Sequence, residues 1–408
     1  MPHNIVRLSN GLRLIHKEID SPISHFGVLV NAGTRDETTT QMGLAHFVEH
    51  TIFKGTEKRN AYHVLNRMET VGGDLNASTS KEETYFHTSF LSQEYARAVE
   101  LLSDIFFHSV FPEKELEKEK SVVLEEINYY QDSPAELIFD DFEDLVFRGH
   151  PLGKNILGTR DSVKHMTREG ILGFIAQNYT LDHIVLASVG NISLKRLVRL
   201  CERYFGHNNI PAIERTRNPF DSYHPQYKIV TKKTSQANVM TGNLAYSIKE
   251  DMRTPFLLMT NIFGGQGMNS RLNMGIREKY GLAYTIEANY TSFSDVGLFA
   301  IYFGSDPQNK DHCLELIQKE MKKMREHKLG TMQLYYAKQQ FVGQLNLSYE
   351  TKLNEMLSIG HSALFFDEVD TVEESLAEIC DTTAEDIMEV ANEILVPEKF
   401  TTLAFTPR

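Results

Sequence analysis

Hydrophobic and polar residues recur with two different periods along the chain, and together they predict a mixed α/β protein. The pattern predicts strands over 5–8, 12–16, 25–30 and 183–188, and two-residue alternation over 75–90 predicts a hairpin. Apolar residues spaced three or four apart predict helices over 40–54, 61–71, 94–108, 112–131, 134–147 and 193–205. Asn10-Gly11 between the first two strands predicts a type I′ hairpin turn.

The second half of the chain repeats this order. Its pattern predicts strands near 226–232, 236–243, 283–291, 295–304 and 400–405, and helices near 252–263, 269–279 and onward to 394. When the halves are overlaid, Phe53-Lys54-Gly55-Thr56 faces Phe263-Gly264-Gly265-Gln266. We therefore expect an α+β protein with two homologous α/β-sandwich domains, each a mostly antiparallel sheet covered by helices. The alternative is two unrelated α/β domains.

The expected domains are 1–208 and 223–408, because residues 209–222 contain Pro, Asn and mixed charge, as linkers do. The chain has 408 residues and a formal net charge of −13, which disfavours nucleic acid and anionic membranes as partners. Its apolar runs are far shorter than the roughly 20 residues of a membrane span. Three widely separated cysteines offer no disulfide framework, so we expect a cytoplasmic protein.

One predicted helix carries a metal-binding pattern. His46 and His50 lie one helical turn apart and face the same way, so both imidazoles can bind one zinc ion. Glu49 lies beside them, and the order His-x-x-Glu-His is the inverse of the zincin motif. The alternative is a pair of ordinary histidines on an amphipathic helix.

A catalytic zinc site needs a third protein ligand and an open position. The predicted helix 112–131 carries Glu119 and Glu126 seven residues apart, on one stripe of its surface. Spacing alone does not choose a ligand among the carboxylates of this helix.

Several blocks together resemble the pitrilysin family of zinc peptidases, most closely its short, two-domain bacterial members. The resemblance covers essentially the whole chain and rests on His46-Phe47-Val48-Glu49-His50, Phe53-Lys54-Gly55-Thr56, Gly72-Gly73-Asp74-Leu75-Asn76-Ala77, Glu119 to Glu126, Ser270-Arg271-Leu272 and Arg277-Glu278-Lys279-Tyr280-Gly281-Leu282-Ala283-Tyr284. It implies one zinc ion per chain, held by His46, His50 and Glu126.

The resemblance also implies a role for each further site residue. Glu49 would act as general base and Glu119 would assist the metal site. Asn76 and Ala77 would lie on an edge strand that accepts the peptide substrate as an added strand. Arg277 and Tyr284, from the second domain, would stabilise the developing oxyanion.

Longer members of this family enclose a chamber with four such domains, so two chains of this length are expected to pair as a clamshell. Because this chain carries every expected part, we expect a homodimer in a bacterial cytoplasm, with a heterodimer as the alternative. The expected activity is zinc-dependent endopeptidase cleavage of short or unfolded peptides. Two other functions remain open, a non-catalytic structural subunit of the same fold and a metal hydrolase of another substrate.

Overall fold

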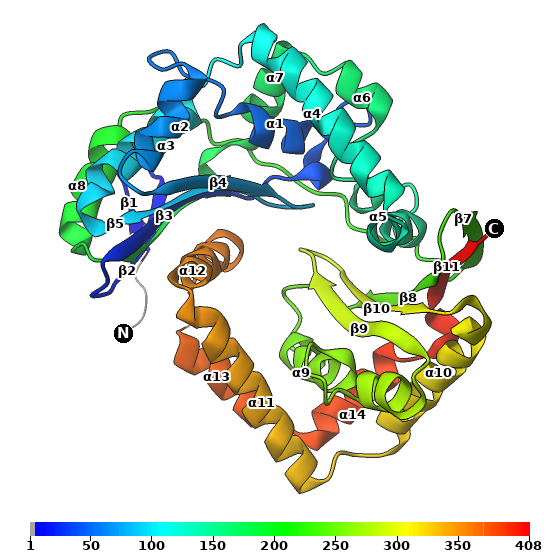
Figure 1. The fold of residues 1–408 in the computed structure, drawn as a ribbon. Coiled ribbons are helices and arrows are strands. Elements are labelled where there is room, and N and C mark those ends of the chain that lie inside the picture. The colour runs from blue at the N-terminus through cyan, green and yellow to red at the C-terminus, as the bar shows by residue number, and fades with distance from the viewer. Residues whose placement is uncertain (1–4, 370) are drawn as a thin grey trace. The chain divides into compact units, whose positions relative to one another are not determined.

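Two sheets built in the same way organise the chain (Figure 1). The structure, a computed structural model, describes residues 5–369 and 371–408. The first sheet contains β1 (Val6–Arg7), β2 (Arg13–Glu18), β3 (Ile23–Val30), β4 (Asp74–Thr79), β5 (Thr84–Leu91) and β6 (Ile184–Gly190). The second contains β7 (Tyr227–Lys232), β8 (Ala237–Ala245), β9 (Ala283–Ser292), β10 (Gly297–Ser305) and β11 (Thr401–Pro407).

The strand orders support the predicted duplication. The first sheet runs β1-β2-β6-β3-β5-β4 and the second β7-β11-β8-β10-β9. In each sheet the opening strand of the repeat pairs in parallel with the closing strand, as β2 with β6 and β7 with β11, and the remaining pairs are antiparallel. The two halves therefore share one topology, although their sequences have diverged.

Helices cover the sheets. The N-terminal half of the sequence forms α1 (Leu44–Thr51), α2 (Ala61–Glu69), α3 (Tyr95–His108), α4 (Glu113–Asp132), α5 (Pro134–Val146), α6 (Arg160–Lys164), α7 (Arg168–Asn178) and α8 (Leu194–Tyr204). The C-terminal half forms α9 (Arg253–Gly264), α10 (Lys310–Glu326), α11 (Thr331–Glu350), α12 (Lys352–Phe366), α13 (Val372–Asp381) and α14 (Ala384–Ile394), with a π-helical segment at Asn273–Glu278. No helix among the described residues is long and apolar enough to cross a membrane.

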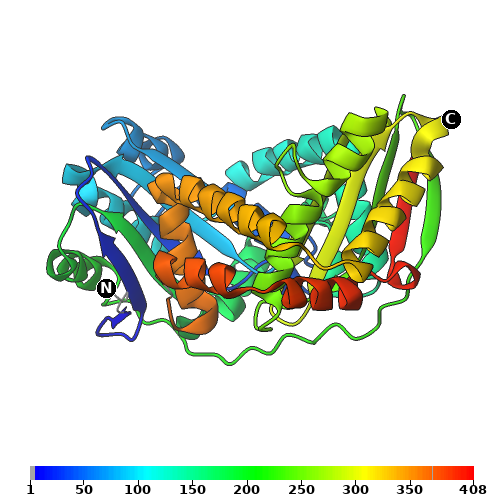
Figure 2. The same cartoon turned by 90° about the horizontal axis from the view of Figure 1, so that it is seen from below.

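Each half of the sequence contributes one helix to the sheet of the other half. Helix α12 packs on β2, β3 and β6, as Figure 2 shows, and α5 packs on β8 and β11. Glycine allows the close approach of α12, because a Cβ on Gly360 would lie 2.7 Å from Leu29 Cδ2 and 2.9 Å from Ala187 Cβ. Phe142 of α5 is fully buried against the second sheet.

The compact units therefore differ from the contiguous domains 1–208 and 223–408 expected from the sequence. One unit comprises residues up to 127, 154–217 and 346–372, and the other comprises 128–153, 218–345 and 373–408. The reason is that each sheet has two apolar faces to cover, while an amphipathic helix pattern does not specify which sheet it covers.

Candidate metal centre

Helix α1 presents two histidines from one side. It begins after Gly43, whose φ of +84° suits glycine, and it is shorter than the predicted 40–54. Buried Leu44, Phe47 and Val48 hold its other side against the core. The His46 and His50 rings lie 4.5 Å apart between centroids, inclined at 61°.

Glu126 from the long helix α4 approaches both imidazoles. Its Oε2 atom lies 3.8 Å from His46 Nε2 and 3.6 Å from His50 Nε2. One donor atom from each of these three residues falls within 4.8 Å of the others, the only such grouping of three metal-binding side chains in the described chain. The structure thus brings the three predicted ligands together.

These donors fit a zinc ion. Ligands bound tetrahedrally at 2.0–2.2 Å are separated by about 3.4 Å, close to the distances observed here. Burial lowers the pKa of His46 to about 3, with the nearby His50 adding to the effect, so the imidazole is neutral and its nitrogen lone pair is free for a metal. Two imidazoles and one carboxylate form a donor set typical of catalytic zinc.

Glu119 supports His50 from behind. Its Oε2 atom lies 3.3 Å from His50 Nδ1, and its Oε1 atom lies 2.5 Å from Lys54 Nζ. Glu119 is only 8% exposed. A carboxylate at Nδ1 places the imidazole proton there and leaves Nε2 free for the metal. The structure therefore distinguishes the two carboxylates that sequence spacing left equivalent. Glu126 faces the Nε2 atoms of both imidazoles, whereas Glu119 faces the Nδ1 atom of His50.

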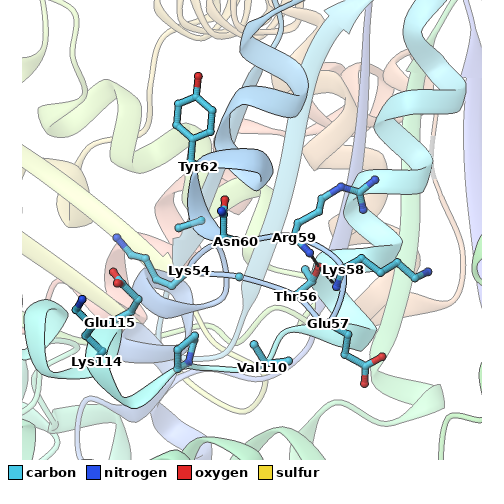
Figure 3. A pocket seen from close by; sticks show the side chains of 13 residues that line it. Lys54, Thr56, Glu57, Lys58, Arg59, Asn60, Tyr62, Val110, Lys114 and Glu115 are labelled. Carbon is cyan, nitrogen blue, oxygen red and sulfur yellow. Dashed lines mark hydrogen bonds between the residues drawn. The ribbon is translucent and has the colours of Figure 1, made fainter.

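Lys54 is a site residue that the sequence reasoning did not single out. A signal existed, because it follows His50 by one helical turn, as His50 follows His46. Lys54 also lies on the wall of a cavity of about 580 Å³ lined by residues 54–62 and by Val110, Pro112, Lys114 and Glu115 (Figure 3). The three candidate metal ligands do not line this cavity, so Lys54 is the link between the two places.

Glu49 lies in a largely buried position next to the ligands. Burial raises its pKa; the Thr79 hydroxyl and His50 oppose that rise, while Glu126 adds to it. Thr79 belongs to β4, so the end of this strand lies beside Glu49. A carboxylate in such surroundings holds a proton more readily than one in water, which suits a general base.

Strand β4 forms the edge of the first sheet. It pairs with β5 through Asn76 opposite His87 and Ala77 opposite Phe86, and no described strand pairs with its other edge. Side chains alternate along a strand, so Ala77 shares the Thr79 face and Asn76 the opposite face. Within its sheet, this edge of β4 therefore has no strand partner among the described residues.

Arg277 and Tyr284 belong to the other compact unit. Arg277 lies in the π-helical segment, and Tyr284 is the second residue of β9, where its hydroxyl donates to Asp306 Oδ1 at 3.2 Å. Tyr284 is 58% exposed, so its ring is accessible. Their predicted role toward the metal centre stays a prediction.

Known proteins match this chain over nearly its whole length. Residues 14–160 match the family described as Insulinase (Peptidase family M16), and residues 165–341 match the family described as Peptidase M16 inactive domain. An uncharacterized zinc protease of Streptomyces coelicolor is 31% identical over 396 residues, covering 95% of this chain and 86% of that protein. One of Rickettsia felis is 33% identical over 401 residues, covering 96% and 94%.

Solved structures show the same fold. A protease from Helicobacter pylori superposes with a TM-score of 0.91 at 20% identity, covering all of both chains. The structure described as the peptidase M16 inactive domain from Pseudomonas fluorescens gives 0.92 at 18% identity, covering 100% of this chain and 98% of that one.

The chain therefore belongs to peptidase family M16, which confirms the family expected from its sequence. Within that family it corresponds to the short bacterial type with two sheet-and-helix domains, whose curated relatives are named zinc proteases.

Proposed function

We propose that this protein is a zinc-dependent endopeptidase that hydrolyses short or unfolded peptides. The observation that carries the proposal is the convergence of donor atoms from His46, His50 and Glu126 within 4.8 Å. Glu49 lies next to His50 on α1, the helix that carries both histidines. One zinc ion per chain, when bound, would polarise the scissile carbonyl and make a water molecule nucleophilic at neutral pH.

The side chains around the ion would divide the remaining work. Glu49 accepts the proton of the attacking water and returns it to the leaving amine, as a general base and then a general acid. Glu119 holds the proton of His50 on Nδ1, and Lys54 holds Glu119 in place through the 2.5 Å contact. Loss of either partner would loosen His50 without removing a ligand.

The free edge of β4 would bind the peptide as an added strand. Main-chain pairing along Asn76 and Ala77 supplies affinity without recognising side chains, which suits an enzyme that cleaves varied sequences. Because Thr79 of the same strand lies beside Glu49, a peptide on this edge would pass close to the proposed base. Arg277 and Tyr284 would stabilise the negative charge that develops on the carbonyl oxygen.

A homodimer is the assembly that we propose. The chain carries the ligands, the base and the Arg277/Tyr284 pair, so no second kind of chain is needed to complete the set. Sedimentation of the purified protein, alone and mixed with candidate partner chains, tests this. A stable monomer that becomes active only with a different chain would contradict it.

The test of function combines cleavage with metal analysis. Wild-type protein should cleave an unstructured peptide, lose activity with a chelator, and regain it with zinc. Glu49→Gln should abolish cleavage and still bind zinc, and Glu126→Gln should lose zinc. Glu125→Gln is the matched control, because this neighbouring carboxylate is exposed and lies outside the ligand set. Full cleavage by Glu49→Gln would refute the mechanism.

A further inference from the structure

The start of helix α1 has no cap of its own. Its N-cap residue is Gly43, which has no side chain to accept hydrogen bonds from the first-turn amides. The helix spans only eight residues, a length that is unstable in isolation. Something outside the helix must satisfy these amides, since buried donors without partners are costly.

The carboxylate of Glu37 takes that place. Its Oε2 atom accepts a 2.8 Å hydrogen bond from the Gly43 amide, and its Oε1 atom accepts one of 2.8 Å from the Ala45 amide. Glu37 is 5% exposed. Burial raises its pKa to about 8, while the amides of Ala45 and Gly43 and the Lys154 ammonium oppose the rise. A carboxyl group is thus kept in a costly position directly before His46.

Ion pairs anchor the segment that carries Glu37. Asp36 is paired with Arg217, whose Nε donates to Oδ1 at 2.9 Å and whose Nη2 donates to Oδ2 at 2.7 Å. Arg35 is paired with Glu82 at 2.7 Å, and both side chains are buried. Residues 35–37 therefore form a fixed support and not a loose loop.

The backbone of residues 157–158 also lies close to the start of α1. A Cβ on Gly43 would lie 2.5 Å from the Leu157 carbonyl oxygen and 2.8 Å from the Gly158 backbone. Lys154 from the same segment donates to the Glu37 carbonyl oxygen at 3.1 Å. The helix start is held between residues 35–37 and residues 154–158.

The two histidines differ in how they are oriented. His50 has Glu119 at its Nδ1 atom, whereas the Nδ1 atom of His46 is buried and has no hydrogen-bond partner among the described residues. A metal-binding histidine usually has its second nitrogen fixed by such a partner. The direction of the His46 ring therefore depends on the backbone of α1, and Glu37 holds that backbone one residue earlier.

We propose that Glu37 is a positioning residue of the metal centre, acting through the first turn of α1 to place His46 relative to His50 and Glu126. The inference rests on the proposed zinc site. Metal–ligand bonds tolerate deviations of only about 0.2 Å, so a small shift of the first turn weakens binding. Glu37 itself contacts neither metal nor substrate.

The test compares two variants that each lose one buried carboxylate. Glu37→Gln keeps one acceptor oxygen and turns an amide donor toward the other N–H. Glu355→Gln is the matched control, because Glu355 is 3% exposed, lies in the same compact unit, and pairs with Lys17 and Lys352 away from α1. The zinc dissociation constant is measured by competition with a chelating dye, and the melting temperature is measured without metal.

Both variants should melt at a lower temperature than wild type. Only Glu37→Gln should bind zinc more weakly, by about tenfold, the effect typical of residues that orient ligands. A purely structural role would lower the melting temperature and leave zinc affinity within twofold of wild type, which would overturn the inference. Wild-type protein that binds no zinc would instead refute the proposed function.

A second variant keeps the test decisive if Glu37→Gln does not fold. Glu37→Asp retains the carboxyl group but is one methylene shorter, so it reaches one amide and not both. It should show weakened zinc binding and faster amide exchange over residues 43–47, with unchanged exchange in α12. Unchanged zinc affinity and unchanged exchange would overturn the inference.

Discussion

Replacing Phe142 by alanine tests whether α5, from the N-terminal half of the sequence, stabilises the second sheet. Phe142 belongs to the N-terminal half, yet it is fully buried in the cluster that joins α5 to Met240, Leu298 and Phe405. Its ring reaches Gly242 of β8, where an added Cβ would lie 3.1 Å from the ring tip. Truncating such a side chain costs about 3–5 kcal/mol, because it leaves a cavity.

Hydrogen exchange followed by mass spectrometry locates that loss. A penalty of at least 3 kcal/mol should speed exchange of the most protected amides in β8, β10 and β11 about 100-fold or more. Met356→Ala in α12 should instead speed hydrogen exchange in β3 and β6, because Met356 is fully buried against the first sheet. Phe366→Ala, at an exposed position of α12, is the control and should change little.

The opposite result would be an effect of each variant on the sheet nearer to it in sequence. Exchange that speeds up in β3 and β6, but not in β8 and β11, after Phe142→Ala would show that α5 covers the first sheet. The pair of variants therefore measures which sheet each helix stabilises, independently of catalysis.

Three further outcomes follow from the contacts. Glu119→Gln should weaken zinc binding by about 10–100-fold, and Lys54→Met should weaken it by less, because these residues hold His50. Lys58→Met, at an exposed position, is the control, and all zinc affinities are measured by competition with a chelating dye. Equal affinities of the three variants and wild type would contradict the proposed support of His50. Burial, together with Arg215 and Arg217, lowers the pKa of His183 to about 4, so the unfolded state binds its proton first and stability falls as pH drops from 6.5 toward 4. For this half-buried group the free energy of unfolding should fall by about 1–2 kcal/mol. Urea unfolding at pH 7 and 4.5 should therefore show a smaller decrease in this free energy for His183→Gln than for wild type. Substrate peptides N-methylated at amides that would pair with β4 should lose at least tenfold in kcat/KM, whereas methylation at alternate amides should not; equal losses would argue against strand addition.

Local features were predictable because they depend on residues near one another in the chain. The i, i+4 spacing placed His46 and His50 on one face of a helix, and short apolar segments marked the strands of both sheets. Even so, the type I′ turn at Asn10-Gly11 was wrong, since only Gly11 takes a positive φ there, +90°. The Asn10 side chain instead donates to the carbonyls of Phe205 and Asn208, and no local pattern announces such distant partners.

The sequence by itself predicted most of the elements, the repeated strand order and the pairing of His46 with His50 on one helix face, because hydrophobic patterns and helical spacing are properties of short segments. The tertiary structure decided which carboxylate of α4 meets both imidazoles, which sheets α5 and α12 cover, and that Glu37 caps the start of α1. These depend on where distant segments meet in space. An amphipathic stripe specifies that a face will be buried, and only packing specifies its partner.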